Sequence, residues 1–346
     1  MSQRVEHFNQ LGRAYGAPLV TAALKSVNED FVVEEIMPIK PDGEGEHLWL
    51  YLEKSGTNTD WLAQLLARLA GVKSMAVSYA GLKDRHGVTR QWFSIQLPGM
   101  ADPDLGGLEA EGVRVLEQVR HSRKLKRGAL SGNRFRLRLR GLQGDRDSLD
   151  SRLQLIREQG VPNYYGEQRF GHGMNNIRKA EQMFEGRMRH LKKHQRSLYL
   201  SAARSWIFNQ VLSQRIQQQC WDRAIPGDVF MLDGKSACFA DDGSEDISQR
   251  LATLDLHITG PLWGEGESMA SSDCLQLEQA VAAENVPLAK GLADARLKQE
   301  RRSLRLKVDE LDWQYDGDDL LLAFALPAGT YATMVLREFM DEHPAG

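Results

Sequence analysis

The segment NRFRLRLR at residues 133–140 alternates between apolar and cationic side chains. Phe135 and two leucines occupy every second position, and four arginines occupy the positions between them. Successive side chains of a β-strand point to opposite faces, so this period of two predicts a strand with one apolar and one cationic face. We therefore expect a half-buried strand, and with it a sheet.

Strand and helix patterns are mixed at both ends of the chain. Residues 30–37 and 46–55 are rich in β-branched and aromatic residues, and the glycine-rich sequence between them predicts a hairpin. Residues 58–71 favour a helix, because apolar residues recur at steps of three and four between an N-cap, Asn58, and a stop, Gly71. The other predicted elements are strands over 75–81 and 89–97 around a polar loop, helices over 147–159 and 197–219, short strand-like pieces over 220–300, and further strands after 303 with a final helix within 330–340.

Charge is segregated along the chain. The net charge is −3, from 44 basic and 47 acidic residues. Residues 118–144 nevertheless carry nine basic residues and no acid, and residues 186–221 carry seven basic residues and no acid. Two such blocks can build a positive cleft on a protein of low net charge, although solvated faces would give the same pattern.

Length and targeting signals bound the protein class. At 346 residues the chain is long enough for two domains, or for one domain with a large insertion. No stretch reaches the roughly 18 to 20 apolar residues of a membrane span, and the first residues contain no apolar signal core. The three cysteines are widely spaced and form no CxxC step. We expect a cytoplasmic protein with reduced cysteines and no membrane partner.

Common cofactor and hydrolase motifs are absent from the sequence. It contains neither GxxxxGK[ST] nor GxSxG, and no predicted strand is followed by GxGxxG. His190 and His194 are the best metal candidate, since histidines one helical turn apart can chelate a cation. Lysines and arginines surround the pair and would repel a cation, so a phosphate backbone suits this segment better. We expect no metal.

One acidic residue lies among cations. Asp84 stands between Lys83 and Arg85, with His86 and Arg90 close by, in the loop predicted between two strands. Neighbouring cations favour the ionised carboxylate, which can act as a nucleophile or a base. Taken alone, the same triplet would also fit a surface salt bridge in a turn.

The run AGLKDRHGVTRQW at 80–92 resembles the active-site motif of the TruD family of tRNA pseudouridine synthases. Further segments resemble family signatures in the same order and span almost the whole chain: LKSVNEDFVVEE (24–35), GEGEHLWL (43–50), ALSGNRFRLRLR (129–140), VPNYYGEQRFG (161–171), LSAARSWIFNQVL (200–212) and LPAGTYATMVLRE (326–338).

The resemblance implies a fold and a set of site residues. The implied fold is α+β: a pseudouridine-synthase-like catalytic core with a mixed sheet, formed by residues 1–155 and 304–346 and interrupted by a TRUD insertion domain at 156–303. Asp84 matches the catalytic aspartate. Phe31, Asn133, Phe135 and Tyr331 match positions that line the uridine pocket, and Lys25 matches a basic position that holds the aspartate or a phosphate. We also expect RNA backbone contacts from Arg134, Arg136, Arg138 and Arg169.

The function that the resemblance implies is isomerisation of uridine, at position 13 of tRNA, to pseudouridine. This isomerisation exchanges no electrons and uses no group donor, so we expect no cofactor, and we expect a monomer with tRNA as its partner. Asp84 could attack C1′ or remove the 2′ proton, and the sequence leaves both routes open. The alternatives are a non-catalytic RNA-binding or RNA-chaperone protein, and a metal-dependent RNA hydrolase that uses Asp84 and the histidine pair.

Overall fold

The computed structural model describes residues 3–188, 190–241 and 246–342, which form two compact units. The first unit contains residues up to Pro18, Asp147–Lys307 and Thr330–Phe339; the second contains Leu19–Arg146, Val308–Gly329 and residues from Met340. The predicted insertion, 156–303, lies within Asp147–Lys307, the longest segment of the first unit. The first unit also includes residues from near both ends of the chain. Its assignment as the family's insertion domain stays a prediction.

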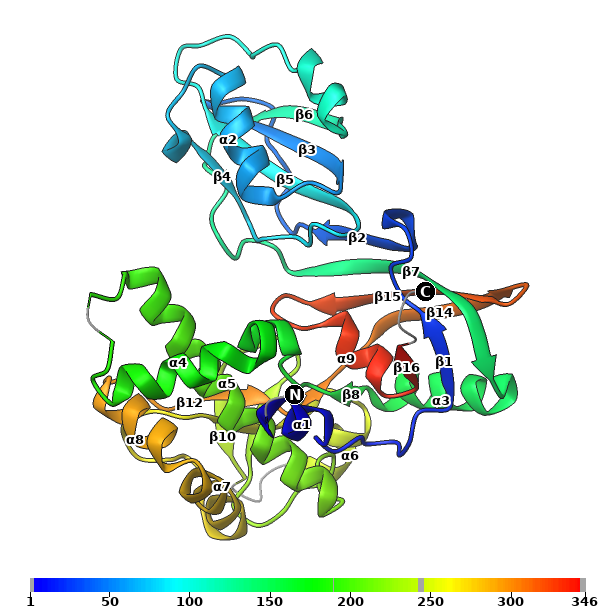
Figure 1. Ribbon diagram of the computed structural model, residues 1–346, viewed down its shortest axis with the longest axis vertical. Helices are drawn as coiled ribbons and strands as arrows, with labels where there is room; N and C mark the ends of the chain where they lie inside the picture. Colours follow the sequence, from blue (N-terminus) through cyan, green and yellow to red (C-terminus); the bar gives the residue numbers. More distant parts are fainter. Residues whose placement is uncertain (1–2, 189, 242–245, 343–346) are drawn as a thin grey trace. The chain divides into compact units, whose positions relative to one another are not determined.

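The second unit is organised around a ten-stranded mixed sheet (Figure 1). Its strands are β1 (Val20–Ala23), β2 (Phe31–Ile36), β3 (His47–Ser55), β4 (Val77–Tyr79), β5 (Val88–Gln96), β6 (Val113–His121), β7 (Gly132–Gly144), β14 (Asp309–Asp316), β15 (Asp319–Pro327) and β16 (Met340–Glu342). The main order is β14-β15-β7-β2-β5-β3-β6, with β4 on β5 and β1 between β7 and β16. The pairs β2–β5 and β1–β16 are parallel and the other described pairs are antiparallel, so the predicted mixed sheet is confirmed.

Strand β7 has the two faces that its alternation predicts. It pairs antiparallel with β15 and β2, and Phe135, Leu137 and Leu139 are buried on one of its faces. Its arginines occupy the other face. On the apolar face, Phe324 of the neighbouring strand β15 lies opposite Phe135, and the two rings stack with 5.3 Å between their centroids.

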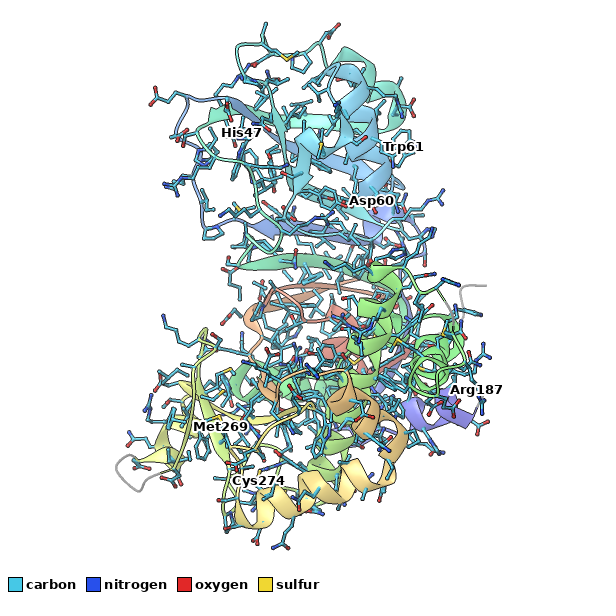
Figure 2. All side chains as sticks on the ribbon, turned by 90° about the vertical axis from the view of Figure 1, so that its left-hand side faces the viewer. His47, Asp60, Trp61, Arg187, Met269 and Cys274 are labelled. Atoms are coloured by element: carbon cyan, nitrogen blue, oxygen red, sulfur yellow. The ribbon has the colours of Figure 1, made fainter. Side chains whose placement is uncertain are left out.

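Helix α2 (Thr59–Leu69) follows β3 and packs against β4 and β5 (Figure 1). The Asn58 side chain accepts hydrogen bonds from the backbone N–H groups of Asp60 and Trp61. Both of these residues, labelled in Figure 2, lie in the first turn of the helix. Gly71 follows the helix with a φ of +64°, a conformation that suits glycine. The predicted helix and both of its end signals are therefore confirmed.

The predicted hairpin of the strands at 30–37 and 46–55 is wrong. Both strands exist, but β5 lies between them, parallel to β2 and antiparallel to β3. The glycine-rich segment is therefore a connection that crosses β5. Turn residues show where a chain bends, and they do not show which strands pair afterwards.

The first unit is built around a long helix, α5 (Lys193–Gln217) (Figure 1). Most of its residues between Tyr199 and Ile216 are buried. The other elements are α1 (Gln3–Asn9), α3 (Arg146–Gln159), β8 (Val161–Pro162), α4 (Asn175–Phe184), β9 (Val229–Leu232), β10 (Cys238–Ala240), α6 (Ile247–Ala252), β11 (Leu256–Leu262), α7 (Ser272–Glu284), α8 (Val286–Asp294), β12 (Glu300–Ser303), β13 (Arg305–Leu306) and α9 (Ala332–Arg337). Helix α5 packs against helices α4, α7 and α8 and against strand β11. The four-stranded sheet has the order β10-β9-β11-β12, and β13 pairs with β8.

Residues 220–300 contain more regular structure than their sequence predicts. Helices α7 and α8 lie where short strand-like pieces were expected. Strand β11 lies among the short strand-like pieces expected there and is a regular strand over Leu256–Leu262. Nearly every residue of β11 is buried, and a strand buried on both faces has no alternation to detect.

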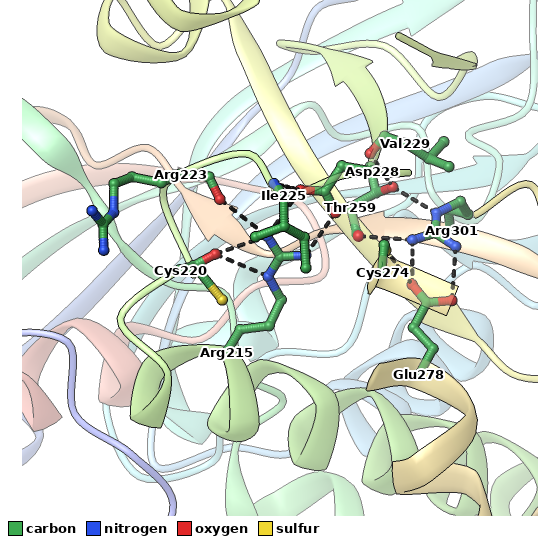
Figure 3. A network of polar contacts seen from close by, with 10 residues as sticks. All are labelled: Arg215, Cys220, Arg223, Ile225, Asp228, Val229, Thr259, Cys274, Glu278 and Arg301. Atoms are coloured by element: carbon green, nitrogen blue, oxygen red, sulfur yellow. Dashed lines mark hydrogen bonds and ion pairs between the residues drawn. The ribbon is translucent and has the colours of Figure 1, made fainter. Parts of the chain in front are cut away.

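Two buried ion pairs tie the first unit together (Figure 3). The Arg215 guanidinium, on α5, donates to both carboxylate oxygens of Asp228 at 2.6 and 2.9 Å and to the Cys220 carbonyl. Arg301 pairs with Glu278 of α7 at 2.6 Å. These partners neutralise charge that would otherwise be costly to bury.

Candidate active site

Asp84 lies in the loop that joins β4 to β5. These strands are antiparallel neighbours, with Val77 opposite Ile95 and Tyr79 opposite Phe93, so both ends of the loop are fixed in the sheet. The Asp84 side chain is 46% exposed, and its Oδ2 accepts a hydrogen bond from Lys25 Nζ at 3.2 Å. The loop therefore presents a carboxylate to solvent beside a cation.

The side chain of Lys83, the residue before Asp84, points into the interior of the unit. Its ammonium lies 2.5 Å from Glu35 Oε1, and both side chains are nearly fully buried. The other Glu35 oxygen accepts from the Trp92 backbone N–H at 2.9 Å, and Thr59 Oγ1 accepts from the Lys83 backbone N–H at 3.1 Å. These hydrogen bonds attach the loop to residues of β2, β5 and α2.

Lys25 connects Asp84 to an aromatic pair. Its Nζ lies 3.9 Å from the centroid of the Phe31 ring, and that ring meets Phe135 edge-on at 6.2 Å. Lys25 also has a φ of +59°, which is unusual for a residue with a Cβ. The structure therefore brings together four of the residues selected from the sequence: Asp84, Lys25, Phe31 and Phe135.

The two phenylalanines are mainly core residues. Phe31 is 2% exposed and Phe135 is 7% exposed. One face of Phe135 is covered by Phe324. They can close the floor of a pocket, and they leave little ring face for a base to stack on.

Asn133 offers a hydrogen-bond acceptor that has no partner in the described structure. It lies opposite Glu35 of β2 and Leu326 of β15. Its Oδ1 is buried and accepts no hydrogen bond from any described residue. Buried side-chain oxygens are normally satisfied, so this one is suited to a donor on a ligand.

Tyr331 and Arg169 meet in the first unit. Tyr331 precedes helix α9 as its N-cap residue, and its hydroxyl accepts from Arg169 Nε at 3.0 Å. Arg169 also donates to Ser201 Oγ at 3.0 Å, and the Tyr331 ring meets Tyr165 edge-on at 6.3 Å. These contacts fix the Tyr331 ring and keep the Arg169 guanidinium beside it.

The arginines of β7 lie on the face of the sheet opposite Asp84, since Asp84 connects through Lys25 and Phe31 to the face that carries Phe135. They also have acidic partners. Arg134 pairs with Glu310 at 2.9 Å, Arg138 pairs with Asp319 at 2.6 Å and with Asp316 at 2.5 Å, and Arg136 has a looser contact with Glu34 at 3.9 Å. The cationic face predicted from the sequence is therefore largely neutralised, and RNA backbone contacts from Arg134, Arg136 and Arg138 stay a prediction.

The histidine pair does not have the geometry assumed for it. His190 precedes α5 with a φ of +59°, whereas His194 lies within the helix, so the two are not one helical turn apart. Within the described ranges, no group of three or more His, Cys, Asp or Glu side chains could hold a metal ion. None of the described helices is both long enough and apolar enough to cross a bilayer.

Sequence reasoning missed the buried supports of the loop, Glu35, Lys54 and Thr59. Lys54 is fully buried and donates to the main-chain carbonyl of Asp84 at 3.1 Å. A signal for it exists: Leu48, Leu50 and Leu52 alternate along β3, and the same period of two places Lys54 on their buried face.

Comparison with known proteins identifies the family. The family model described as tRNA pseudouridine synthase D (TruD) matches residues 11–176 and 172–339. The tRNA pseudouridine synthase D of Hydrogenovibrio crunogenus is 49% identical over 329 residues, 95% of each chain. That of Methylococcus capsulatus is 49% identical over 341 residues, covering 98% of this chain and 96% of the relative.

A solved structure has the same fold. The crystal structure of the putative tRNA pseudouridine synthase D (TruD) from Methanosarcina mazei matches with a TM-score of 0.71 at 22% identity, covering 96% of this chain and 97% of the other. The α+β fold class predicted from the sequence is therefore that of a pseudouridine synthase. This chain belongs to the TruD family of tRNA pseudouridine synthases.

Proposed function

We propose that this protein is an isomerase that converts uridine to pseudouridine in tRNA, with Asp84 as its catalytic residue. The observation that carries the proposal is the Asp84 carboxylate itself. It is exposed on an anchored loop, 3.2 Å from the Lys25 ammonium. Family membership supplies the reaction class, and this geometry supplies a group that can perform it.

The reaction breaks the bond between N1 and C1′, turns the uracil and rejoins it through C5. No electrons are exchanged and no outside group enters, so the proposed reaction uses no cofactor and no metal. Asp84 either attacks C1′, forming a covalent sugar intermediate, or removes the 2′ proton. Lys25 donates a hydrogen bond to the Asp84 carboxylate and so orients the group that acts in either route.

Recognition of the base is assigned to Asn133, Phe31, Phe135 and Tyr331. A base in folded RNA must be extruded, at a cost of a few kcal/mol, and is then read by hydrogen bonds to its edge and by stacking. The free Asn133 oxygen can accept the uracil N3–H, and the two buried phenylalanines provide an apolar floor. Tyr331, held by Arg169, keeps its family-based role toward the base.

The finer parts of the proposal rest on the resemblance. They are uridine 13 as the target, tRNA as the partner of a monomer in the cytoplasm, residues 156–303 as the insertion domain, and Arg169, Arg134, Arg136 and Arg138 as RNA backbone contacts. Among these arginines, Arg169 has support from its place beside Tyr331.

Chemical mapping of pseudouridine tests the proposal. Unmodified tRNA is incubated with the protein and treated with a carbodiimide, and modified positions are read as stops in reverse transcription. We expect one new stop at position 13 and none in a tRNA that carries cytidine there. Binding of tRNA without a new stop at any position would favour the non-catalytic RNA-binding alternative.

A further inference from the structure

Lys54 is a buried charged residue of the second unit. It lies near the end of β3, and no part of its side chain is exposed. An ammonium group is costly to bury without a compensating partner. No carboxylate oxygen of the described residues lies within salt-bridge distance of it, and its hydrogen bonds go to two main-chain carbonyls: Thr57 O at 2.6 Å and Asp84 O at 3.1 Å.

These two bonds join two loops. Thr57 belongs to the turn between β3 and α2, and Asp84 belongs to the loop between β4 and β5. A second contact runs parallel to them, from Arg85 Nε to the Gly56 carbonyl at 3.2 Å. Lys54 thus fixes the backbone of the residue whose side chain the proposed chemistry uses.

We propose that Lys54 is a positioning residue, whose buried ammonium holds the Asp84 backbone so that the carboxylate meets the ribose in a productive orientation. The inference rests on the proposed function. It assigns Lys54 no contact with the substrate. Lys54 acts on Asp84 through its hydrogen bond to the Asp84 carbonyl and through the positive charge that it places beside the loop.

The charges around Lys54 set the pH at which it should act. Burial lowers the pKa of Lys54 to about 8; the Asp84 carboxylate opposes this shift and the Lys83 ammonium adds to it. Lys25 and Glu35 pair with Asp84 and Lys83 respectively. The charged form of Lys54 is therefore lost as the pH rises through about 8.

Activity and stability should then change in opposite directions. Because the folded-state pKa lies below the unfolded value of about 10.5, the unfolded state binds more protons between these values, and this group makes unfolding less favourable as the pH rises. A fall in rate caused by Lys54 should therefore occur while the protein stays folded.

The test measures kcat, KM for tRNA and the melting temperature from pH 6.5 to 9 for the intact protein, Lys54→Met and Lys54→Arg. Lys40→Met, at an exposed position in the same unit, controls for loss of one lysine. We expect Lys54→Met to lower kcat roughly 10- to 100-fold at pH 7 with little change in KM. We expect kcat of the intact protein to fall above pH 8, and this fall to be absent in Lys54→Arg, whose guanidinium keeps its charge.

Two results would overturn the inference. One is a folded Lys54→Met with the kcat and pH profile of the intact protein. The other, which holds even if both variants fail to fold, is a kcat of the intact protein that is constant from pH 7 to 9. If the intact protein forms no pseudouridine at any pH, the proposed function fails and the inference fails with it.

Discussion

Replacing Glu35 by glutamine tests whether the loop is anchored by a buried ion pair. Glu35 accepts from Lys83 Nζ at 2.5 Å with one oxygen and from the Trp92 N–H at 2.9 Å with the other. Glutamine has nearly the same volume but only one oxygen. In either orientation of the glutamine amide, its NH₂ group faces a donor, which is either Lys83 Nζ or the Trp92 N–H. The Lys83 ammonium also loses its counter-charge.

The expected cost follows from the burial of both partners, whose side chains are 6% and 0% exposed for Lys83 and Glu35. Breaking a buried pair by removing one partner costs about 3 to 5 kcal/mol, because the other charge stays buried. Exposed pairs contribute about 0 to 1 kcal/mol. Arg114, which is 62% exposed beside Glu53, gives a matched control through Arg114→Met.

Equilibrium unfolding in urea measures these costs. We expect Glu35→Gln and Lys83→Met each to lower the free energy of unfolding by about 3 kcal/mol or more. The double variant should lose clearly less than the sum. Losses below about 1 kcal/mol for both single variants, with no coupling between them, would show that the pair is solvated and would refute the reasoning.

Three further predictions concern residues selected from the sequence. Asn133→Leu should lower kcat/KM at least tenfold without lowering the free energy of unfolding, because the oxygen that it removes is buried without a described partner; a large loss of stability in urea would contradict this. Tyr331→Ala should lower activity more than Tyr331→Phe, which keeps the ring and removes only the acceptor for Arg169; equal losses in a single-turnover assay would place the effect in the hydroxyl. If the β7 face binds phosphate, Arg136→Ala should reduce the salt slope of tRNA binding by about one unit and Arg138→Ala, whose guanidinium is already paired, by less; no change in either slope would remove this face from the interface.

Features encoded within a few residues could be predicted from the sequence. Helix α2 begins at a cap, Asn58, that acts on its own next turn, and it ends before a glycine with positive φ. The two faces of β7 follow from side-chain alternation alone. Asp84 could be selected because its motif is contiguous, and the strands on either side hold its loop as expected.

Features that depend on distant pairing could not be predicted. The arginines of β7 form a free cationic face in the sequence, but Arg134 and Arg138 meet acids from β14 and β15, more than 170 residues further along the chain. The insertion of β5 between β2 and β3 is also a choice of strand partners that no local signal encodes. Lys54 was missed because a lysine in a strand usually faces solvent. Its position two residues after Leu52 nevertheless places it on the same face as Leu48, Leu50 and Leu52, which are buried.

The most direct test of the central claim is release of tritium from tRNA labelled at C5 of its uridines, with intact protein and with Asp84→Asn, in the presence of EDTA and without added cofactor. Rejoining the base through C5 must displace the hydrogen there. We expect release by the intact protein and none by Asp84→Asn, with tRNA binding retained by the variant. Equal release by both proteins would contradict the assignment of Asp84, and no release by a folded, tRNA-binding intact protein would contradict the proposed activity.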